Sequence, residues 1–185
     1  QSALAPRTFS TVPPADADAV GRAARLLSAA QDPVILAGGG SRGAAPELRE
    51  LAERPGAPVV TTLNAKGVLD EWHPLALGSN LRLAAARDRA RDADVLLVVG
   101  SKLGEAELWV EHLEARGEVI RIDLLASQID KNQPASIGLV GDAAATLRAI
   151  RAALGDGAPR DAAAGVAETL AAVRAECAEL SAENS

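Results

Sequence analysis

The sequence predicts a doubly wound α/β fold, in which a mainly parallel sheet has helices on both faces. Short, continuously apolar runs alternate with stretches whose apolar residues recur at helical spacing. The first of these runs, residues 33–37, breaks directly into Gly38-Gly39-Gly40. The chain has 185 residues, of which 48% are hydrophobic, and this suffices for one core. Strands and helices alternating at this spacing imply right-handed βαβ units and a parallel sheet.

Five segments are predicted as strands. Each is short, apolar and rich in β-branched residues, as strands buried on both faces should be. They are residues 34–37, 58–62, 95–100, 119–123 and 137–141. A sixth, shorter candidate strand is 75–77.

The segments between the strands show helical periodicity. The predicted helices are 16–30, 44–54, 81–93, 105–116 and 142–154. Gly155 follows the last of these helices in the position of a C-terminal cap.

The two ends of the chain differ from its middle. Residues 1–14 contain three prolines and little periodicity, which predicts an extended linker before a domain at 15–154. Residues 155–185 are predicted as a second linker followed by an amphipathic helix. Its apolar stripe, spaced by three and four residues, consists of Val166, Leu170, Val173, Cys177 and Leu180. This stripe requires a partner surface, either the domain's own sheet or helices or a coiled-coil partner.

Composition argues against several classes of function. The net charge is −6, and the 19 basic residues are dispersed among 25 acidic ones, so we expect no nucleic-acid surface. Cys177 is the only cysteine, and neither His73 nor His112 has a partner at metal-ligand spacing, so no metal site is predicted. No apolar run approaches the roughly 20 residues of a membrane span, and no signal-peptide pattern begins the chain. We therefore expect no membrane association and a cytoplasmic protein.

Ligands of open parallel sheets bind outside the carboxyl ends of the strands. The residues that end the predicted strands are therefore the ones to consider, and they include Thr61, Asn64, Gly141 and Asp142. The candidate cofactor-binding residues among them are Gly38, Gly39, Gly40, Ser41, Thr62, Gly100, Ser101, Lys102 and Asp123. The glycines suit either a phosphate or ribose cradle or only a tight strand-to-helix turn. Asp123 suits either ribose hydroxyls or a turn, and Lys102 either a phosphate or solvent. No grouping of side chains indicates a catalytic residue in this chain.

An ordered succession of short motifs resembles the central domain of thiamine-diphosphate-dependent enzymes, a family that includes acetolactate synthase and benzoylformate decarboxylase. The resemblance covers about residues 16–154 and rests on order and spacing. The motifs are Pro33-Val-Ile-Leu-Ala-Gly-Gly-Gly40, Ala57-Pro-Val-Val-Thr-Thr62, Ala65-Lys-Gly67, His73-Pro-Leu75, Leu77-Gly78, Ala93-Asp-Val-Leu-Leu-Val-Val-Gly100, Arg121-Ile-Asp123, Lys131-Asn132 and Val140-Gly-Asp142.

The resemblance implies a six-stranded parallel, Rossmann-like sheet of the type that binds NAD or FAD. It implies a flanking pyrimidine-binding domain on one side and a diphosphate-binding domain on the other. Those two domains would hold thiamine diphosphate and Mg²⁺, and the complete enzyme would be a homodimer or homotetramer. Such an enzyme would be an acetolactate-synthase-like carboligase or a 2-keto acid decarboxylase, and this chain alone would be inactive.

Some central domains of this family bind FAD, but three departures here argue against a flavin. Flavin-binding members usually have a glycine where this chain has Ser79-Asn80-Leu81. They tend to have an arginine after the Gly-Ser pair that ends the fourth strand, where this chain has Lys102-Leu103. They commonly have a second aspartate where this chain has Leu125. Lysine lacks the planar fork of arginine, and a leucine adds bulk beside backbone that must approach the cofactor. The alternative is a free-standing FAD- or NAD-type nucleotide-binding module of the same fold, which the glycine loop and Asp123 would suit.

Overall fold

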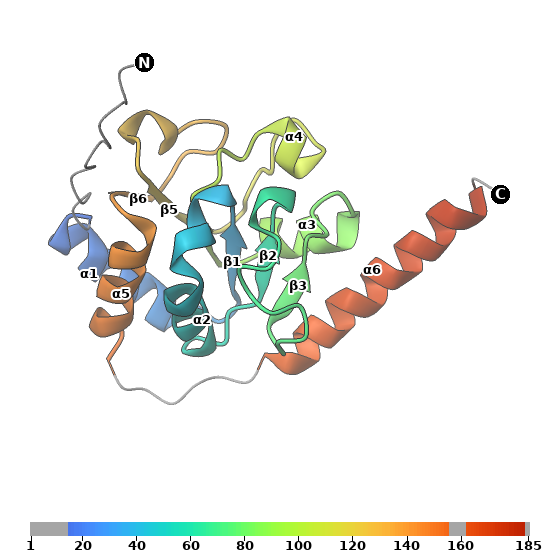
Figure 1. The fold of residues 1–185 in the computed structure, drawn as a ribbon, viewed down its shortest axis with the longest axis horizontal. Coiled ribbons are helices and arrows are strands. Elements are labelled where there is room, and N and C mark those ends of the chain that lie inside the picture. Colours follow the sequence, from blue (N-terminus) through green and yellow to red (C-terminus); the bar gives the residue numbers. More distant parts are fainter. Residues whose placement is uncertain (1–14, 156–161, 184–185) are drawn as a thin grey trace, which may run out of the picture.

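One six-stranded sheet forms the centre of the structure, a computed structural model that describes residues 15–155 and 162–183 (Figure 1). The strand order is β3-β2-β1-β4-β5-β6, and every neighbouring pair is parallel. The strands are β1 (Pro33–Ala37), β2 (Val59–Thr61), β3 (Ala76–Gly78), β4 (Val95–Val99), β5 (Glu118–Asp123) and β6 (Ile137–Val140). The predicted doubly wound parallel sheet is confirmed, whereas the linker predicted at 1–14 lies outside the described residues.

β1 and β4 lie at the centre of the sheet, and their sequences explain this place. All five residues of each strand are buried, as expected for strands covered on both faces. The two strands pair along their whole length, from Pro33 beside Val95 to Ala37 beside Val99. Their carboxyl ends therefore stop at the same level.

The helices and 3₁₀ turns lie between and around the strands. The helices are α1 (Ala17–Ala29), α2 (Ala45–Glu53), α3 (Ala84–Arg91), α4 (Glu105–Leu108), α5 (Ala143–Ala153) and α6 (Ala163–Glu183). The 3₁₀ turns are η1 (Gly39–Ala44), η2 (Leu63–Ala65) and η3 (Ala126–Gln128).

Short polar side chains and one glycine set the helix ends. The Asp16 carboxylate accepts a hydrogen bond from Ala19 N at the start of α1, and Asp142 accepts one from Ala145 N at the start of α5. Gly155 follows α5 at φ 70°, a left-handed conformation that suits glycine, so its predicted role as a C-terminal cap is confirmed.

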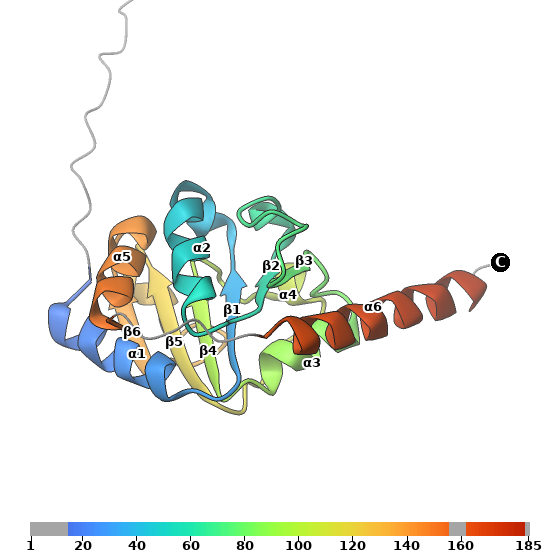
Figure 2. The ribbon, with the colours of Figure 1, turned by 90° about the horizontal axis from the view of Figure 1, so that it is seen from below.

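The helices cover both faces of the sheet. The β1–α2–β2 and β3–α3–β4 connections run in opposite directions across the sheet, and right-handed crossovers therefore place α2 and α3 on opposite faces. α5 packs against α2 and also against α1, while α6 packs against α3. Figures 1 and 2 show both groupings, and in both views α6 extends beyond the rest of the domain.

The helix predicted at 105–116 is wrong beyond Leu108. α4 has only four residues, and Trp109 closes it at φ 62° with its N–H bonded to the Glu105 carbonyl. Leu103, Leu108 and Leu113 are all buried at intervals of five residues. An interval of five places successive side chains on different faces of a helix, so one straight helix could not bury all three.

The helix predicted at 81–93 is shorter than expected. α3 begins at Ala84, and Leu81 and Leu83 precede it with both side chains buried. A two-residue interval between buried side chains is the pattern of extended chain, which explains why the helix starts later.

The stripe of α6 packs within the domain as far as Cys177, whereas Leu180 at its end is 42% exposed. Val166 and Val173 are buried and belong to the same core cluster as the strands, with Leu170 and Cys177 packed against that cluster. α6 contacts α3 and the edge strand β3. Among the described residues, no helix is long and apolar enough to cross a membrane.

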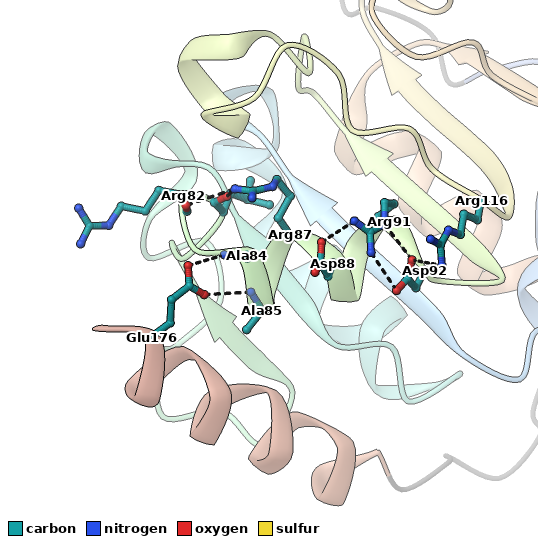
Figure 3. A network of polar contacts seen from close by, with 10 residues as sticks. Arg82, Ala84, Ala85, Arg87, Asp88, Arg91, Asp92, Arg116 and Glu176 are labelled. Atoms are coloured by element: carbon teal, nitrogen blue, oxygen red, sulfur yellow. Dashed lines mark hydrogen bonds and ion pairs between the residues drawn. The ribbon is translucent and has the colours of Figure 1, made fainter. Parts of the chain in front are cut away.

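A carboxylate from α6 caps α3. Leu83 precedes α3 and supplies no side-chain cap, but the Glu176 carboxylate accepts hydrogen bonds from Ala84 N at 2.8 Å and Ala85 N at 3.1 Å (Figure 3). Two amides that would otherwise lack partners at this helix start are thereby satisfied. Glu176 thus couples the position of α6 to α3.

The other end of α3 carries a charged network, also visible in Figure 3. Arg91 bonds to Asp88 and Asp92, and Arg116 lies 3.0 Å from Asp92. The hydrogen bonds from Arg91 and the charge of Arg116 lower the pKa of Asp92. These groups are partly or largely exposed, so the network contributes little to stability and mainly makes this end of the molecule polar.

Replacing Glu176 by alanine tests this cap. Glu176→Ala should lower the free energy of unfolding by about 1 kcal/mol, since two amides at the start of α3 lose their acceptor. Glu176→Gln should lose less, because an amide oxygen still accepts one hydrogen bond. Urea unfolding followed by circular dichroism measures both, and Glu179→Ala, on the exposed part of the same helix, is the control. Equal losses for Glu176→Ala and Glu179→Ala would contradict the capping role.

Candidate functional site

The carboxyl ends of β1 and β4 form the topological switch point of the sheet. From β1 the chain proceeds to β2 on one side, and β4 continues to β5 on the other. Ligands of open α/β sheets bind in the crevice that such a divergence leaves. Gly38–Gly40 and Gly100–Lys102 follow these two strands, so the structure brings these candidate residues together.

The two loops touch backbone to backbone at the switch point. A Cβ on Gly38 would lie 2.3 Å from the Gly100 carbonyl oxygen, and a Cβ on Gly40 would lie 2.8 Å from the Gly100 Cα. Gly100 itself has φ 59°, and a Cβ there would lie 2.5 Å from the Gly40 Cα. The glycines are therefore required for close packing of one loop on the other.

Hydrogen bonds within the protein occupy three amides of this loop, those of Gly38, Gly40 and Ser41. Gly38 N donates to the Val99 carbonyl at 2.8 Å, Gly40 N to the Gly100 carbonyl at 3.0 Å, and Ser41 N to the Gly38 carbonyl at 2.9 Å. The buried Ser41 hydroxyl also donates to the Gly38 carbonyl, at 2.7 Å. A phosphate at this loop would compete with these bonds for the same donors.

Two further candidate residues are buried beneath the surface. Thr62 N donates to the Ala37 carbonyl, and its buried hydroxyl has no partner in the structure. The Ser101 hydroxyl donates to Glu107 at 2.8 Å and accepts from Leu103 N at 3.1 Å. Ser101 therefore holds the turn that leads into α4.

Arg121 ties together two loops at the carboxyl end of the sheet, and the sequence placed it only within the motif Arg121-Ile-Asp123. This β5 residue is 1% exposed, and its guanidinium donates to the carbonyls of Ser101 at 2.8 Å, Lys131 at 2.5 Å and Gln133 at 3.0 Å. It thereby joins the loop after β4 to the loop between β5 and β6. A charged residue within the apolar run 119–123 was the signal available in the sequence.

Burial lowers the pKa of Arg121 from its ordinary value, and three nearby carboxylates oppose that shift. They belong to Asp123, Asp130 and Glu107. Arginine keeps its charge under such a shift because its ordinary pKa lies far above neutral pH. The interior therefore contains a cation whose hydrogen bonds go to backbone carbonyls.

A pocket of about 230 Å³ opens beside the closed loops, at the carboxyl ends of β4, β5 and β6. Four candidate residues line it: Gly40, Gly100, Lys102 and Asp123. Gly141 and Asp142, which follow the strand predicted at 137–141, also line it, and Ile122, Leu124 and Ala143 complete it. Two of its carboxylates already accept backbone hydrogen bonds, Asp123 from Leu125 N and Asp142 from Ala145 N.

The pocket beside the switch point is small for a dinucleotide. The pocket is smaller than the roughly 300–1,000 Å³ of ordinary small-molecule sites. The amides of Gly38 and Gly40 are bonded within the protein. In residues 15–155 and 162–183, no three His, Cys, Asp or Glu side chains are grouped to hold a metal ion.

Comparison with known families explains this fold and loop pattern. The profile of the family described as "Thiamine pyrophosphate enzyme, central domain" matches residues 20–150. The chain belongs to this family. The resemblance seen in the motifs is thereby confirmed.

Three relatives illustrate which proteins contain such a central domain. Over 169 residues the chain is 37% identical to a probable 2-ketoarginine decarboxylase of Pseudomonas aeruginosa, covering 89% of this chain and 30% of that protein. It is 40% identical over 138 residues to a probable acetolactate synthase large subunit of Methanocaldococcus jannaschii, covering 72% and 23%. It is 34% identical over 143 residues to a pyruvate oxidase of Lactiplantibacillus plantarum, covering 76% and 24%. The chain thus spans less than a third of the length of these relatives.

A methyl group at Gly38 tests the loop contact of this central domain. Gly38→Ala should lower the free energy of unfolding by at least about 2 kcal/mol, because the methyl group meets main-chain atoms that cannot move aside. Gly43→Ala, in the same turn but with nothing within 4 Å of the added methyl, should change it by less than about 0.5 kcal/mol. Thermal unfolding of both variants makes the comparison. Similar stability of the two variants would contradict the contact.

Arg121→Met tests the buried cation. The change leaves the Ser101, Lys131 and Gln133 carbonyls without their donor and should cost about 2–4 kcal/mol. Arg82→Met, at an exposed position, should stay within about 0.5 kcal/mol of the parent. Urea unfolding gives both values. A stable Arg121→Met protein would show that the three carbonyls find other donors.

Proposed function

We propose that this chain is the middle domain of a larger thiamine-diphosphate-dependent enzyme that decarboxylates a 2-keto acid. The observation that supports this most is the match along residues 20–150, together with relatives named as a 2-ketoarginine decarboxylase and acetolactate synthases. A 2-keto acid decarboxylase and an acetolactate-synthase-like carboligase are the two forms proposed, and decarboxylation of the substrate is common to both.

Thiamine diphosphate, bound with Mg²⁺, supplies the electron sink that decarboxylation of a 2-keto acid requires. We assign both to domains outside this chain, a pyrimidine-binding and a diphosphate-binding domain. The role that we propose for this chain is to connect and orient those two domains. Its rigid carboxyl edge, held by the glycine contact and by Arg121, suits that role.

A flavin is not part of the proposal. The bonded amides of Gly38, Gly40 and Ser41 and the small neighbouring pocket favour a central domain without FAD. Lys102, which borders the pocket, and Leu125, just beyond it, also depart from the flavin-binding pattern.

The complete enzyme is proposed to be a cytoplasmic homodimer or homotetramer. The competing proposal is a free-standing nucleotide-binding module. It draws on the pocket beside Lys102 and Asp123, where a lysine and a carboxylate could meet phosphate and ribose. Family membership and the short span relative to the relatives favour the enzyme.

Activity of the full-length protein tests the proposal. The protein encoded by the complete reading frame should release CO₂ from pyruvate or 2-ketoarginine only when thiamine diphosphate and Mg²⁺ are both present. The 185-residue chain should release none, because its proposed cofactor-binding domains are missing. Product analysis separates an aldehyde from a carboligation product.

Omission of each cofactor in turn is the control for this assay. Turnover that does not depend on thiamine diphosphate, or a reading frame that holds only this domain, would overturn the proposed function. In the second case the nucleotide-binding module would take its place.

A further inference from the structure

His73 lies where the β2–β3 connection meets α2, and both of its ring nitrogens are occupied. Nδ1 lies 3.2 Å from Leu75 N, and Nε2 lies 3.1 Å from Glu53 Oε1. The His73 side chain is only 10% exposed. His73 therefore joins the last residue of α2 to the residue that precedes β3.

These two contacts fix the position of the ring proton. The Leu75 N–H can only donate, so Nδ1 is the unprotonated nitrogen that accepts this hydrogen bond. Nε2 then carries the proton and donates a hydrogen bond to the Glu53 carboxylate. The ring is thus a neutral imidazole of one defined tautomer.

The hydrogen bond at Nδ1 supports the start of the edge strand. The Leu75 carbonyl accepts a hydrogen bond from Val59 N at 2.8 Å where β2 begins, and the His73 carbonyl accepts one from Ala76 N at 2.9 Å. β3 has only three residues, pairs with β2 alone and is contacted by α6. The Leu75 amide is therefore held at a point where the sheet has few other bonds.

Glu53 is the charged neighbour of the ring on α2. Its carboxylate also accepts a hydrogen bond from Arg49 Nε at 2.8 Å. The hydrogen bond from Arg49, followed by the one from His73, lowers the pKa of Glu53. Glu53 therefore stays ionised in neutral and mildly acidic solution.

Charged groups of the other neighbouring elements are engaged elsewhere. In the β2–β3 connection, Lys66 pairs with Glu71 at 3.5 Å, and the Asp70 carboxylate accepts a hydrogen bond from Trp72 N at 2.9 Å. On α6, which contacts β3, the Glu176 carboxylate bonds to the start of α3. Carboxylates, lysine and arginine ordinarily keep their charge between about pH 5.5 and 7.5, whereas histidine ordinarily changes its charge there.

We infer that His73 is an acid-sensitive latch at the edge of the sheet, an inference that does not depend on the proposed function. A proton taken up by the ring binds at Nδ1, because Nε2 already carries one. Nδ1 then becomes a donor that faces the Leu75 N–H, and the hydrogen bond between them is lost. The imidazolium stays bonded to the Glu53 carboxylate through Nε2. Acidification thus leaves His73 attached to α2 and releases the residue that precedes β3.

Hydrogen exchange of the full-length protein tests this latch. Protection of the Leu75 amide, corrected for the intrinsic effect of pH, should fall about three- to tenfold between about pH 7.5 and 5.5, as expected from the loss of one hydrogen bond. Overlapping peptides isolate this amide by mass spectrometry, since Pro74 has no amide proton. The Thr62 amide, which bonds to the Ala37 carbonyl, is the internal reference and should keep its protection.

His73→Asn separates the latch from a general effect of acid. Asparagine can accept a hydrogen bond from the N–H two residues further on, as in an Asx turn, but takes up no proton in this range. Protection of Leu75 should then be the same at both pH values. His112→Asn, at a half-exposed side chain, is the matched control and should keep the pH dependence of the parent.

Glu53→Gln provides a second measurement should His73→Asn fail to fold. The glutamine oxygen still accepts from Nε2, but the imidazolium loses its charged partner, so the midpoint of the fall in protection should move to lower pH by about half a unit. An unchanged midpoint would overturn the latch. Leu75 protection that is constant in the parent, or that falls equally in His73→Asn, would also overturn it.

Discussion

The contact between the β1 and β4 loops is the constraint on which the rest of the site depends. Gly38 and Gly40 lie so close to Gly100 that a side chain at any of the three positions would collide with main chain. The parallel register of β1 and β4 brings these glycines to the same level. The loops also bond to each other, since Gly40 N donates to the Gly100 carbonyl.

Open space lies directly beside this contact. The pocket reaches from Gly40 and Gly100 towards the carboxyl ends of β5 and β6. Arg121 joins the loop after β4 to the loop between β5 and β6 through the carbonyls of Ser101, Lys131 and Gln133. Main-chain contacts and the hydrogen bonds of Arg121 thus tie the loops of the carboxyl edge together, which suits a domain that positions others.

The sequence predicted those parts of the fold that local pattern determines. The strands were placed to within one residue at each end, because a short apolar run between turns permits few alternatives. The segment after Gly104 was predicted incorrectly, since the burial of Leu103, Leu108 and Leu113 depends on contacts made far along the chain. The sequence could not predict which candidate glycines contact the opposite loop and which line a pocket, because this depends on how closely the loops after β1 and β4 approach each other. The role of Arg121 could not be predicted either, because it depends on where the fold places the carbonyls of Ser101, Lys131 and Gln133.

Titration of FAD into the full-length enzyme tests the central claim most directly. We propose that the bonded amides of Gly38 and Gly40 and the small pocket beside them leave this central domain without FAD. Quenching of flavin fluorescence should then show no saturable binding up to about 100 μM. Stoichiometric binding of one FAD per chain with a Kd of about 1 μM or lower, abolished by Lys102→Glu at the pocket, would contradict the account.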